Sequence, residues 1–289
     1  MIRVVFYDKM RAMARALAKI VVIVGPTTSG KSDYAVRLAR KINGEIISVD
    51  SRQVYRGLDI GTAKITKRQM RGIRHHCLDI ASPKKAFTVD NFVKAAKRAI
   101  DQILENGKTP IIAGGTGFYI DALLYKNSLP NVPPNPALRT SLGCRTPNQL
   151  FVMLKKLDSR RAREIDRANP RRLIRAIEIA TALGKVPSLK KTPRYDAKII
   201  FLNPKPAILK KRIAARTAHM LRRGLVAEVK KLLAKKIPRA RIRELGFEYK
   251  FPLDYIDGKI SRPELAQKLN TETWRYAKRQ LTWFKKYNP

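Results

Sequence analysis

Residues 25–32 read Gly25-Pro26-Thr27-Thr28-Ser29-Gly30-Lys31-Ser32, a complete G-x-x-x-x-G-K-[ST] phosphate loop. A continuous β-branched run over residues 20–24 precedes it and is typical of a strand buried on both faces of a sheet. Residues 33–42 follow with apolar side chains at helical spacing. In this context backbone N–H groups and the helix N-terminus cradle a polyphosphate, Lys31 adds a point charge, and the Ser32 hydroxyl can ligate magnesium. The motif predicts a phosphorylated ligand without identifying it.

The charge of the chain is strongly one-sided. Its 289 residues, enough for one large domain or two small ones, include 62 Lys and Arg against 22 Asp and Glu, a formal net charge of +40. The basic residues are spread along the whole length. Such a field favours polyanions, and affinity for nucleic acid would fall steeply with salt. The alternative is adaptation of a whole proteome to a salty or otherwise unusual cytosol.

Cysteine content and hydropathy exclude several classes of protein. Cys77 and Cys144 are too few for a disulfide framework and lack the spacing of a zinc site. No apolar run reaches the roughly 18 residues that a membrane span needs. Residues 1–19 are basic with short, broken apolar stretches, so a mispredicted start or a disordered arm is favoured over a secretory signal or transit peptide. We expect a cytoplasmic protein, no membrane association and, by default, a monomer.

A second predicted strand, residues 46–49, ends at Asp50. A carboxylate at the carboxyl end of a parallel strand lies where α/β sheets bind ligands. Asp50 alone could equally be a helix cap or a magnesium ligand. Residues 50–64 are rich in polar groups and glycine and predict a loop that carries function.

A further buried strand is predicted over residues 110–113 and runs directly into Gly114-Gly115-Thr116-Gly117. In a typical phosphate-loop ATPase the corresponding strand would end in an acidic residue that helps to hold magnesium. The glycines argue against ordinary ATP hydrolysis. His75 and His76 precede Cys77, but adjacent side chains point in different directions, which argues against metal binding. We expect these histidines to line the cleft or to hydrogen-bond the loop.

The remaining pattern predicts the domain organisation. Prolines after residue 126 form a linker, followed by helices over residues 147–157 and 169–183 without strand signal. Residues 197–202 return to the sheet, and basic amphipathic helices follow. The predicted fold is α/β, a P-loop NTPase-like parallel sheet core with a small all-helical insertion domain. Its parts are a basic N-terminal extension (1–19), the first part of the core (20–125), the helical insertion domain (126–190), and the second part of the core with C-terminal helices (191–289).

The motifs together resemble one family. GPTTSGKS, DSRQVYRGLDIGTAK, HHCLD, GGTGFY, the basic segment 171–175 and YAKRQLTWF occur in the order seen in tRNA dimethylallyltransferases, and the resemblance runs from about residue 20 to 286. It implies transfer of a dimethylallyl group from dimethylallyl diphosphate to the exocyclic amine of the adenosine 3′-adjacent to the anticodon in tRNA. It also implies Mg²⁺ as cofactor, and diphosphate rather than a nucleotide in the phosphate loop, which would explain the missing acidic strand end.

The same resemblance implies roles for individual residues. Asp50 would accept the amine proton or hydrogen-bond the amine, and Thr116 would lie near the reacting centre. Lys31, Arg216 and a magnesium ion on Ser32 would neutralise charge as the carbon–oxygen bond breaks. Contacts to tRNA are implied for Asp50, Ser51, Arg52, Gln53, Thr116, Arg171, Arg172, Leu173, Ile174 and Arg175. For the basic cluster among these, a solvated helix face is the plainer interpretation.

Two segments depart from the family pattern, and three alternative functions remain. Thr273-Trp274-Arg275 replaces a usual Thr-Arg, and Glu248 stands where Lys is common.

An adenylate dimethylallyltransferase acting on free AMP, ADP or ATP would not need the +40 charge or the helical insertion. A P-loop small-molecule kinase is disfavoured by the glycine-rich strand end. A non-enzymatic RNA-binding protein is disfavoured by the intact Lys31, Asp50 and Arg216.

Overall fold

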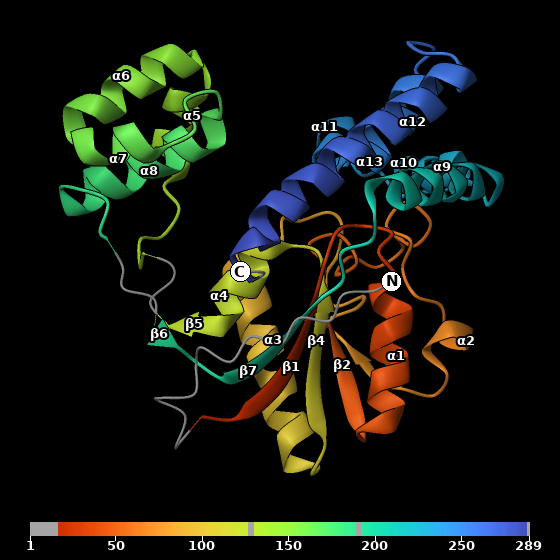
Figure 1. Ribbon diagram of the computed structural model, residues 1–289. Coiled ribbons are helices and arrows are strands. Elements are labelled where there is room, and N and C mark those ends of the chain that lie inside the picture. The colour runs from red at the N-terminus through yellow and green to blue at the C-terminus, as the bar shows by residue number, and fades with distance from the viewer. Residues whose placement is uncertain (1–16, 127–129, 189–191, 288–289) are drawn as a thin grey trace. The chain divides into compact units, whose positions relative to one another are not determined.

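Figure 1 shows a computed structural model of the chain, which describes residues 17–126, 130–188 and 192–287. The chain divides into two compact units. One is an α/β unit, made of the residues up to 124 and from 193 onward, and the other is a helical unit, residues 125–192. The α/β class with a parallel sheet is thereby confirmed. The basic extension predicted over residues 1–19 lies almost entirely outside the described residues.

A five-stranded parallel sheet forms the core of the α/β unit. Its order is β3-β2-β4-β1-β7, with β1 (Lys19–Val24), β2 (Gly44–Val49), β3 (His75–His76), β4 (Thr109–Gly114) and β7 (Asp196–Phe201). Val24 of β1 is paired with Gly114 of β4, which is paired in turn with Val49 of β2. The three strands therefore end together, and the loops that follow them meet at one edge of the sheet.

Helices cover both faces of this sheet (Figure 1). On one face α1 (Lys31–Lys41) buries Ala35, Val36 and Ala39 against side chains of β1, β2 and β4. On the other lies α3 (Val89–Glu105), which begins at a capping box between Thr88 and Asn91. Coverage on both sides explains why β1, β2 and β4 are buried at runs of consecutive residues rather than at alternate residues. The unit also contains two shorter helices, α2 (Lys67–Met70) and α4 (Gly117–Leu124), of which α4 packs against α3.

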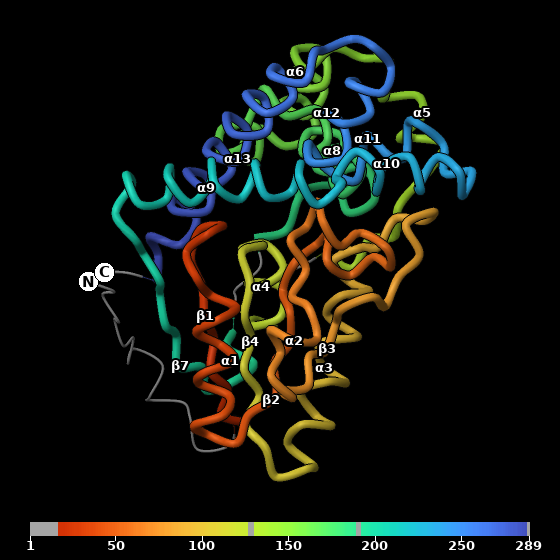
Figure 2. The backbone as a smooth tube through the Cα atoms, turned by 90° about the vertical axis from the view of Figure 1, so that its right-hand side faces the viewer, coloured from red at the N-terminus to blue at the C-terminus, as the bar shows by residue number. Residues whose placement is uncertain are grey.

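The C-terminal helices gather over the carboxyl ends of the strands (Figure 2). They are α9 (Pro206–Arg222), α10 (Leu225–Ala234), α11 (Arg239–Glu244), α12 (Phe247–Ile256) and α13 (Arg262–Phe284), followed by the 3₁₀ turn η2 (Lys285–Tyr287). The sequence pattern missed α11 and α12, because α11 has six residues and Pro252 lies inside α12. No helix in the described ranges is both long and apolar enough to cross a membrane.

The helical unit consists of α5 (Pro136–Gly143), α6 (Pro147–Leu157), α7 (Ser159–Glu164) and α8 (Pro170–Leu183) around one apolar core. Local sequence sets their starts, because a polar N-cap side chain accepts a backbone hydrogen bond at each one. These N-caps are Asn135, Thr146, Asp158 and Asn169. A two-stranded ribbon, β5 (Tyr125–Lys126) with β6 (Thr192–Pro193), lies where the chain leaves and re-enters; strands of two residues are too short to show an alternating pattern.

One buried carboxylate organises the polar contacts of the helical unit. Glu178, 2% exposed, accepts two hydrogen bonds from Arg139, at 2.9 and 2.8 Å, and one from the backbone N–H of Asn135 at 2.6 Å. Arg175 is its further ion-pair partner. Burial alone would raise the pKa of Glu178, but these hydrogen bonds lower it to about 2.

Candidate active site

The phosphate loop connects β1 to α1 at the edge of the sheet where strands end. Gly30 adopts the left-handed conformation, with φ of 91°, at the N-cap of α1. Residues 27–32 line a cavity of about 740 Å³, the size of a small-molecule site, whereas Gly25 and Pro26 are buried and do not line it. Phosphate contacts are therefore expected from the second part of the motif.

Lys31 is held back against the loop. Its Nζ donates to the Pro26 carbonyl at 2.6 Å and lies 3.4 Å from Ser29 Oγ. Burial first, and the nearby Arg216 second, lower the pKa of Lys31 to about 7, while Asp50 opposes the shift. An anion placed in the loop would favour the charged lysine.

Two arginines from α9 reach the same loop. Arg216 donates to Thr27 Oγ1 at 2.7 Å and to the Thr62 carbonyl at 3.4 Å. Arg212 donates to the Thr28 carbonyl at 3.3 Å. A spacing of four residues places both on one face of the helix. Sequence reasoning included Arg216 and missed Arg212, although that spacing was a usable signal.

The carboxylate of Asp50 faces the cavity from the end of β2. Its Oδ1 accepts the backbone N–H groups of Arg52 at 2.8 Å and Gln53 at 3.2 Å. Its Oδ2 has no hydrogen-bond partner among the described residues. One oxygen thus fixes the side chain while the other remains available to a ligand, and both Ser51 and Arg52 line the cavity beside it.

Thr116 lies just behind this wall rather than on it. Its hydroxyl accepts the backbone N–H of Ser51 at 3.3 Å, and it is not among the residues that line the cavity. The strand before it does end in glycine, for a steric reason. A β-carbon at Gly114 would lie 2.1 Å from the Val49 carbonyl oxygen, so an acidic side chain does not fit there.

Gln280 of α13 joins two of the loops. Its Oε1 accepts the backbone N–H of Thr27 at 2.8 Å, and its Nε2 donates to the Gly115 carbonyl at 2.8 Å. Tyr276, one turn earlier, lines the cavity and has its pKa raised, mainly by burial and then by Asp50. Neither was selected from the sequence, although both lie in the YAKRQLTWF segment.

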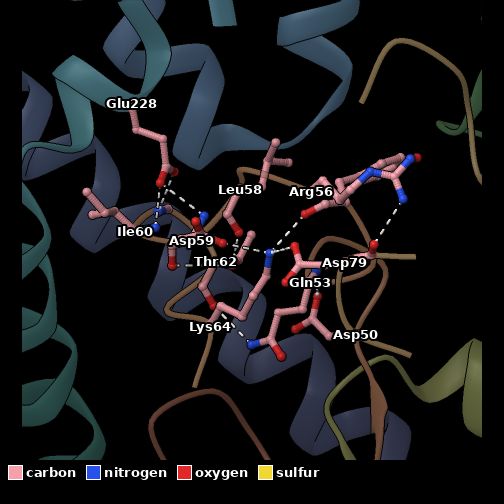
Figure 3. Close-up of polar contacts among 12 residues, drawn as sticks. Asp50, Gln53, Arg56, Leu58, Asp59, Ile60, Thr62, Lys64, Asp79 and Glu228 are labelled. Atoms are coloured by element: carbon pink, nitrogen blue, oxygen red, sulfur yellow. Dashed lines mark hydrogen bonds and ion pairs between the residues drawn. The ribbon is translucent and has the colours of Figure 1, made fainter. Parts of the chain in front are cut away.

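The loop of residues 50–64 is braced from several sides (Figure 3). Glu228 of α10 accepts the consecutive backbone N–H groups of Asp59, Ile60 and Gly61 at 3.0, 2.7 and 3.0 Å. Gln53 accepts from Ser48 at 3.0 Å and donates to the Thr62 carbonyl at 3.2 Å. Both polar ends of Gln53 are thus engaged within the protein.

A buried lysine adds a second brace to the same loop. Lys64 Nζ binds Asp59 at 2.7 Å, Asp79 at 2.6 Å and the carbonyl of Tyr55 at 2.9 Å. These contacts tie the two ends of the turn at residues 55–64 together. These contacts therefore hold the loop in one conformation as part of the cavity wall.

The predicted tRNA segment lies on α8 of the helical unit. Arg171 and Arg172 are exposed and Ile174 is half-buried. Leu173 is fully buried in the unit's core, so we withdraw its side chain from the set of tRNA contacts. Arg175 pairs with Glu178 and donates to the Val132 carbonyl at 2.8 Å, which gives it a structural task within the unit.

His75 and His76 lie on the edge strand β3 and do not line the cavity, so that part of the expectation was wrong. His76 Nε2 lies 2.7 Å from Glu45 Oε2, and His75 Nδ1 lies 2.9 Å from the Ile73 carbonyl. Within the described ranges no three His, Cys, Asp or Glu side chains are grouped to hold a metal ion.

The fold and site define a class: a phosphate-loop α/β protein whose cavity lacks the acidic strand end usual for nucleotide hydrolysis. The family model described as "IPP transferase" matches residues 53–287, and the chain belongs to this IPP transferase family. A tRNA dimethylallyltransferase of Anoxybacillus flavithermus is 41% identical over 277 residues, covering 94% of this chain and 88% of the relative. One from Caldanaerobacter subterraneus is 40% identical, covering 93% and 90%.

Solved structures of transferases that act on tRNA are also similar to this chain. The tRNA isopentenylpyrophosphate transferase of Staphylococcus epidermidis matches with a TM-score of 0.67 and 37% identity, covering 93% of this chain and 90% of that one. A eukaryotic dimethylallyltransferase captured acting on tRNA matches with a TM-score of 0.80 and 29% identity, covering 92% and 70%.

Proposed function

We propose that this enzyme transfers the dimethylallyl group of dimethylallyl diphosphate to the exocyclic amine of the adenosine 3′-adjacent to the anticodon in tRNA, releasing diphosphate. The observation that carries the proposal is the shared cavity, in which the Asp50 carboxylate faces the same space as Lys31 and Arg216. The names of the relatives support tRNA as acceptor over free nucleotides, and prenyl transfer over a kinase reaction.

The phosphate loop is the proposed donor site. Its backbone N–H groups, Lys31 and Arg216 would hold the diphosphate, and the bond from its oxygen to the dimethylallyl carbon breaks in the reaction. The negative charge left on that oxygen is stabilised by the two cations. Arg216 already bonds Thr27 of the loop at 2.7 Å, so it needs little rearrangement to reach a bound phosphate.

Magnesium fits this donor site. The Ser32 residue is exposed in the cavity, and the carboxylates of Asp33 and Asp50 line the same space. Hydroxyl and carboxylate oxygens, with diphosphate oxygens and water, are the ligands that Mg²⁺ prefers. A magnesium ion held by Ser32 would supply charge neutralisation to the diphosphate.

Asp50 is the proposed proton acceptor. As the new carbon–nitrogen bond forms, the amine nitrogen loses a proton, and the free Oδ2 of Asp50 is positioned to take it. Thr116 would act through its bond to the Ser51 N–H, which orients the cavity wall. The target base has to leave the stacked anticodon loop to enter the cavity.

The proposed tRNA contacts beyond the cavity are ionic. Arg171 and Arg172 are exposed on α8 and suit phosphate oxygens, and Ser51 and Arg52 line the cavity where the base would enter. With tRNA as its substrate, the enzyme is proposed to act in the cytoplasm.

The test is a transfer assay with labelled dimethylallyl diphosphate and Mg²⁺, offering total tRNA and, separately, AMP, ADP and ATP. The expected result is label in tRNA that moves to isopentenyladenosine after digestion. Label in free nucleotides alone would replace the proposal with cytokinin synthesis. No transfer to either acceptor, with the donor still binding, would indicate an RNA-binding protein that has lost its chemistry.

A further inference from the structure

Besides Asp33 and Asp50, the cavity contains a third carboxyl group, Glu248, for which the mechanism above has no use. Glu248 is half-buried in the first turn of α12, and its side chain folds back over the preceding Gly246. A β-carbon added at Gly246 would lie 2.8 Å from Glu248 Oε2 and 3.5 Å from Arg52 Nε. The carboxyl group is therefore near Arg52, on the side of the cavity formed by the C-terminal helices.

Charged groups from several elements face Glu248. They are Arg216 of α9, Arg52 and Asp50 of the loop after β2, Tyr276 of α13 and, further along the same cavity, Lys31, Arg212 and Arg279. Burial raises the pKa of Glu248 to about 7, although Arg216 and Arg52 favour its charged form. Glu248 therefore gains or loses its proton near neutral pH, and the positive charge of Arg216 favours its ionised form.

Diphosphate and ionised Glu248 are like charges that would share one cation. Arg216 is bonded to the phosphate loop through Thr27 and lines the same cavity as Glu248, so a diphosphate in the loop and the Glu248 carboxylate both interact with the charge of Arg216. In a cavity partly shielded from water such repulsion is stronger than at the surface. A bound diphosphate should therefore raise the pKa of Glu248 further and favour its neutral form.

We infer that Glu248 is a proton-linked release residue: ionised, it competes with the diphosphate for Arg216 and weakens its binding, and protonated, it leaves Arg216 to the diphosphate. The inference rests on the proposal that the phosphate loop holds the diphosphate of the donor. Because the product diphosphate leaves from the same contacts, deprotonation of Glu248 promotes its release.

The test is calorimetric binding of inorganic diphosphate to the full chain at one Mg²⁺ concentration. At about pH 8.5 we expect Glu248→Gln to bind about tenfold more tightly than wild type, because the variant lacks one like charge. At about pH 6 the two should agree within about twofold, because wild-type Glu248 is then protonated and resembles glutamine. Protonation of free diphosphate is common to both proteins and cancels in the ratio.

Glu244→Gln is the matched control, since Glu244 is an exposed carboxylate on α11 that does not line the cavity. Its affinity ratio to wild type should stay near one at both pH values. A Glu248→Gln ratio that does not change with pH overturns the inference, as does weaker binding at both. Glu248→Ala serves if the glutamine variant does not fold, with the same pH-dependent ratio expected. Absence of diphosphate binding to wild type itself overturns the donor proposal and the inference with it.

Discussion

At the scale of single residues, the two carboxylate oxygens of Asp50 have different roles. Oδ1 is held by the N–H groups of Arg52 and Gln53, which leaves Oδ2 for the amine proton. Asp50→Ala should lower single-turnover transfer by about 10²- to 10⁴-fold, the share typical of a general base. Binding of tRNA, measured by filter retention, should change little, because one cavity carboxylate adds little to a contact made mainly by cations.

The control for this variant is Asp101→Ala, which removes an exposed carboxylate from α3, outside the cavity. It should leave both transfer and binding unchanged. Lost tRNA binding with normal single-turnover chemistry in Asp50→Ala would contradict the assigned role and make Asp50 a recognition residue.

At the scale of elements, the loop after β2 depends on a carboxylate from a distant helix. Both oxygens of Glu228 accept hydrogen bonds, Oε2 from Asp59 and Ile60, and Oε1 from Gly61 and the Tyr249 hydroxyl at 2.9 Å. Glutamine would turn an NH₂ group toward donors, a mismatch that costs about 1–3 kcal/mol. Glu228→Gln should therefore speed amide hydrogen exchange over residues 58–64.

Activity should fall in the same variant, because the Thr62 carbonyl within this loop accepts hydrogen bonds from the cavity residues Gln53 and Arg216. The expected loss is in kcat/KM, by about tenfold. Glu105→Gln, at the exposed end of α3, is the control and should change neither exchange nor activity. Unaltered exchange at residues 58–64 in Glu228→Gln would show that the loop does not depend on this clamp.

The helical unit has its own dependence on one carboxylate. Glu178 has a folded-state pKa of about 2 against an ordinary value of 4.5, so its contribution to stability is complete above about pH 4.5 and is lost as the pH falls toward 2. Glu178→Ala should destabilise this unit by about 3 kcal/mol, because Arg139 and Arg175 lose their buried partner. Urea unfolding followed by helical circular dichroism measures both effects. Glu164→Ala, at an exposed site of α7, should cost much less.

The sequence could predict features that are encoded in one continuous segment, but not contacts between residues far apart in the chain. The strand, loop and helix around residues 19–41 are encoded in one continuous pattern, and the fold class and family followed from them and from motif order. The contact of Gln280 with Thr27 could not be found this way, because it joins residues 253 positions apart in the sequence. Glu248 and Glu228 likewise act on segments that only the folded chain brings near. The side chain of Leu173 was included among the tRNA contacts because a motif does not show which of its residues face the core.

At the scale of the whole molecule, the net charge of +40 is far larger than the active site requires. A field of this size attracts any polyanion and steers tRNA toward the protein from a distance, with an effect that salt screens. Specific contacts must therefore be distinguished from the general field. The slope of log affinity against log salt does this, because it counts the phosphates that are neutralised in the complex.

Arg172→Glu tests whether the helical unit makes such a contact. Arg172 is exposed on α8, and reversing its charge should weaken tRNA binding and reduce the salt slope by about one. Arg98→Glu makes the same change of net charge on α3, in the α/β unit, and should leave the slope nearly unchanged. Equal reductions in both variants would mean that the overall field, not α8, determines the binding of tRNA. An unchanged slope in Arg172→Glu would remove α8 from the tRNA interface.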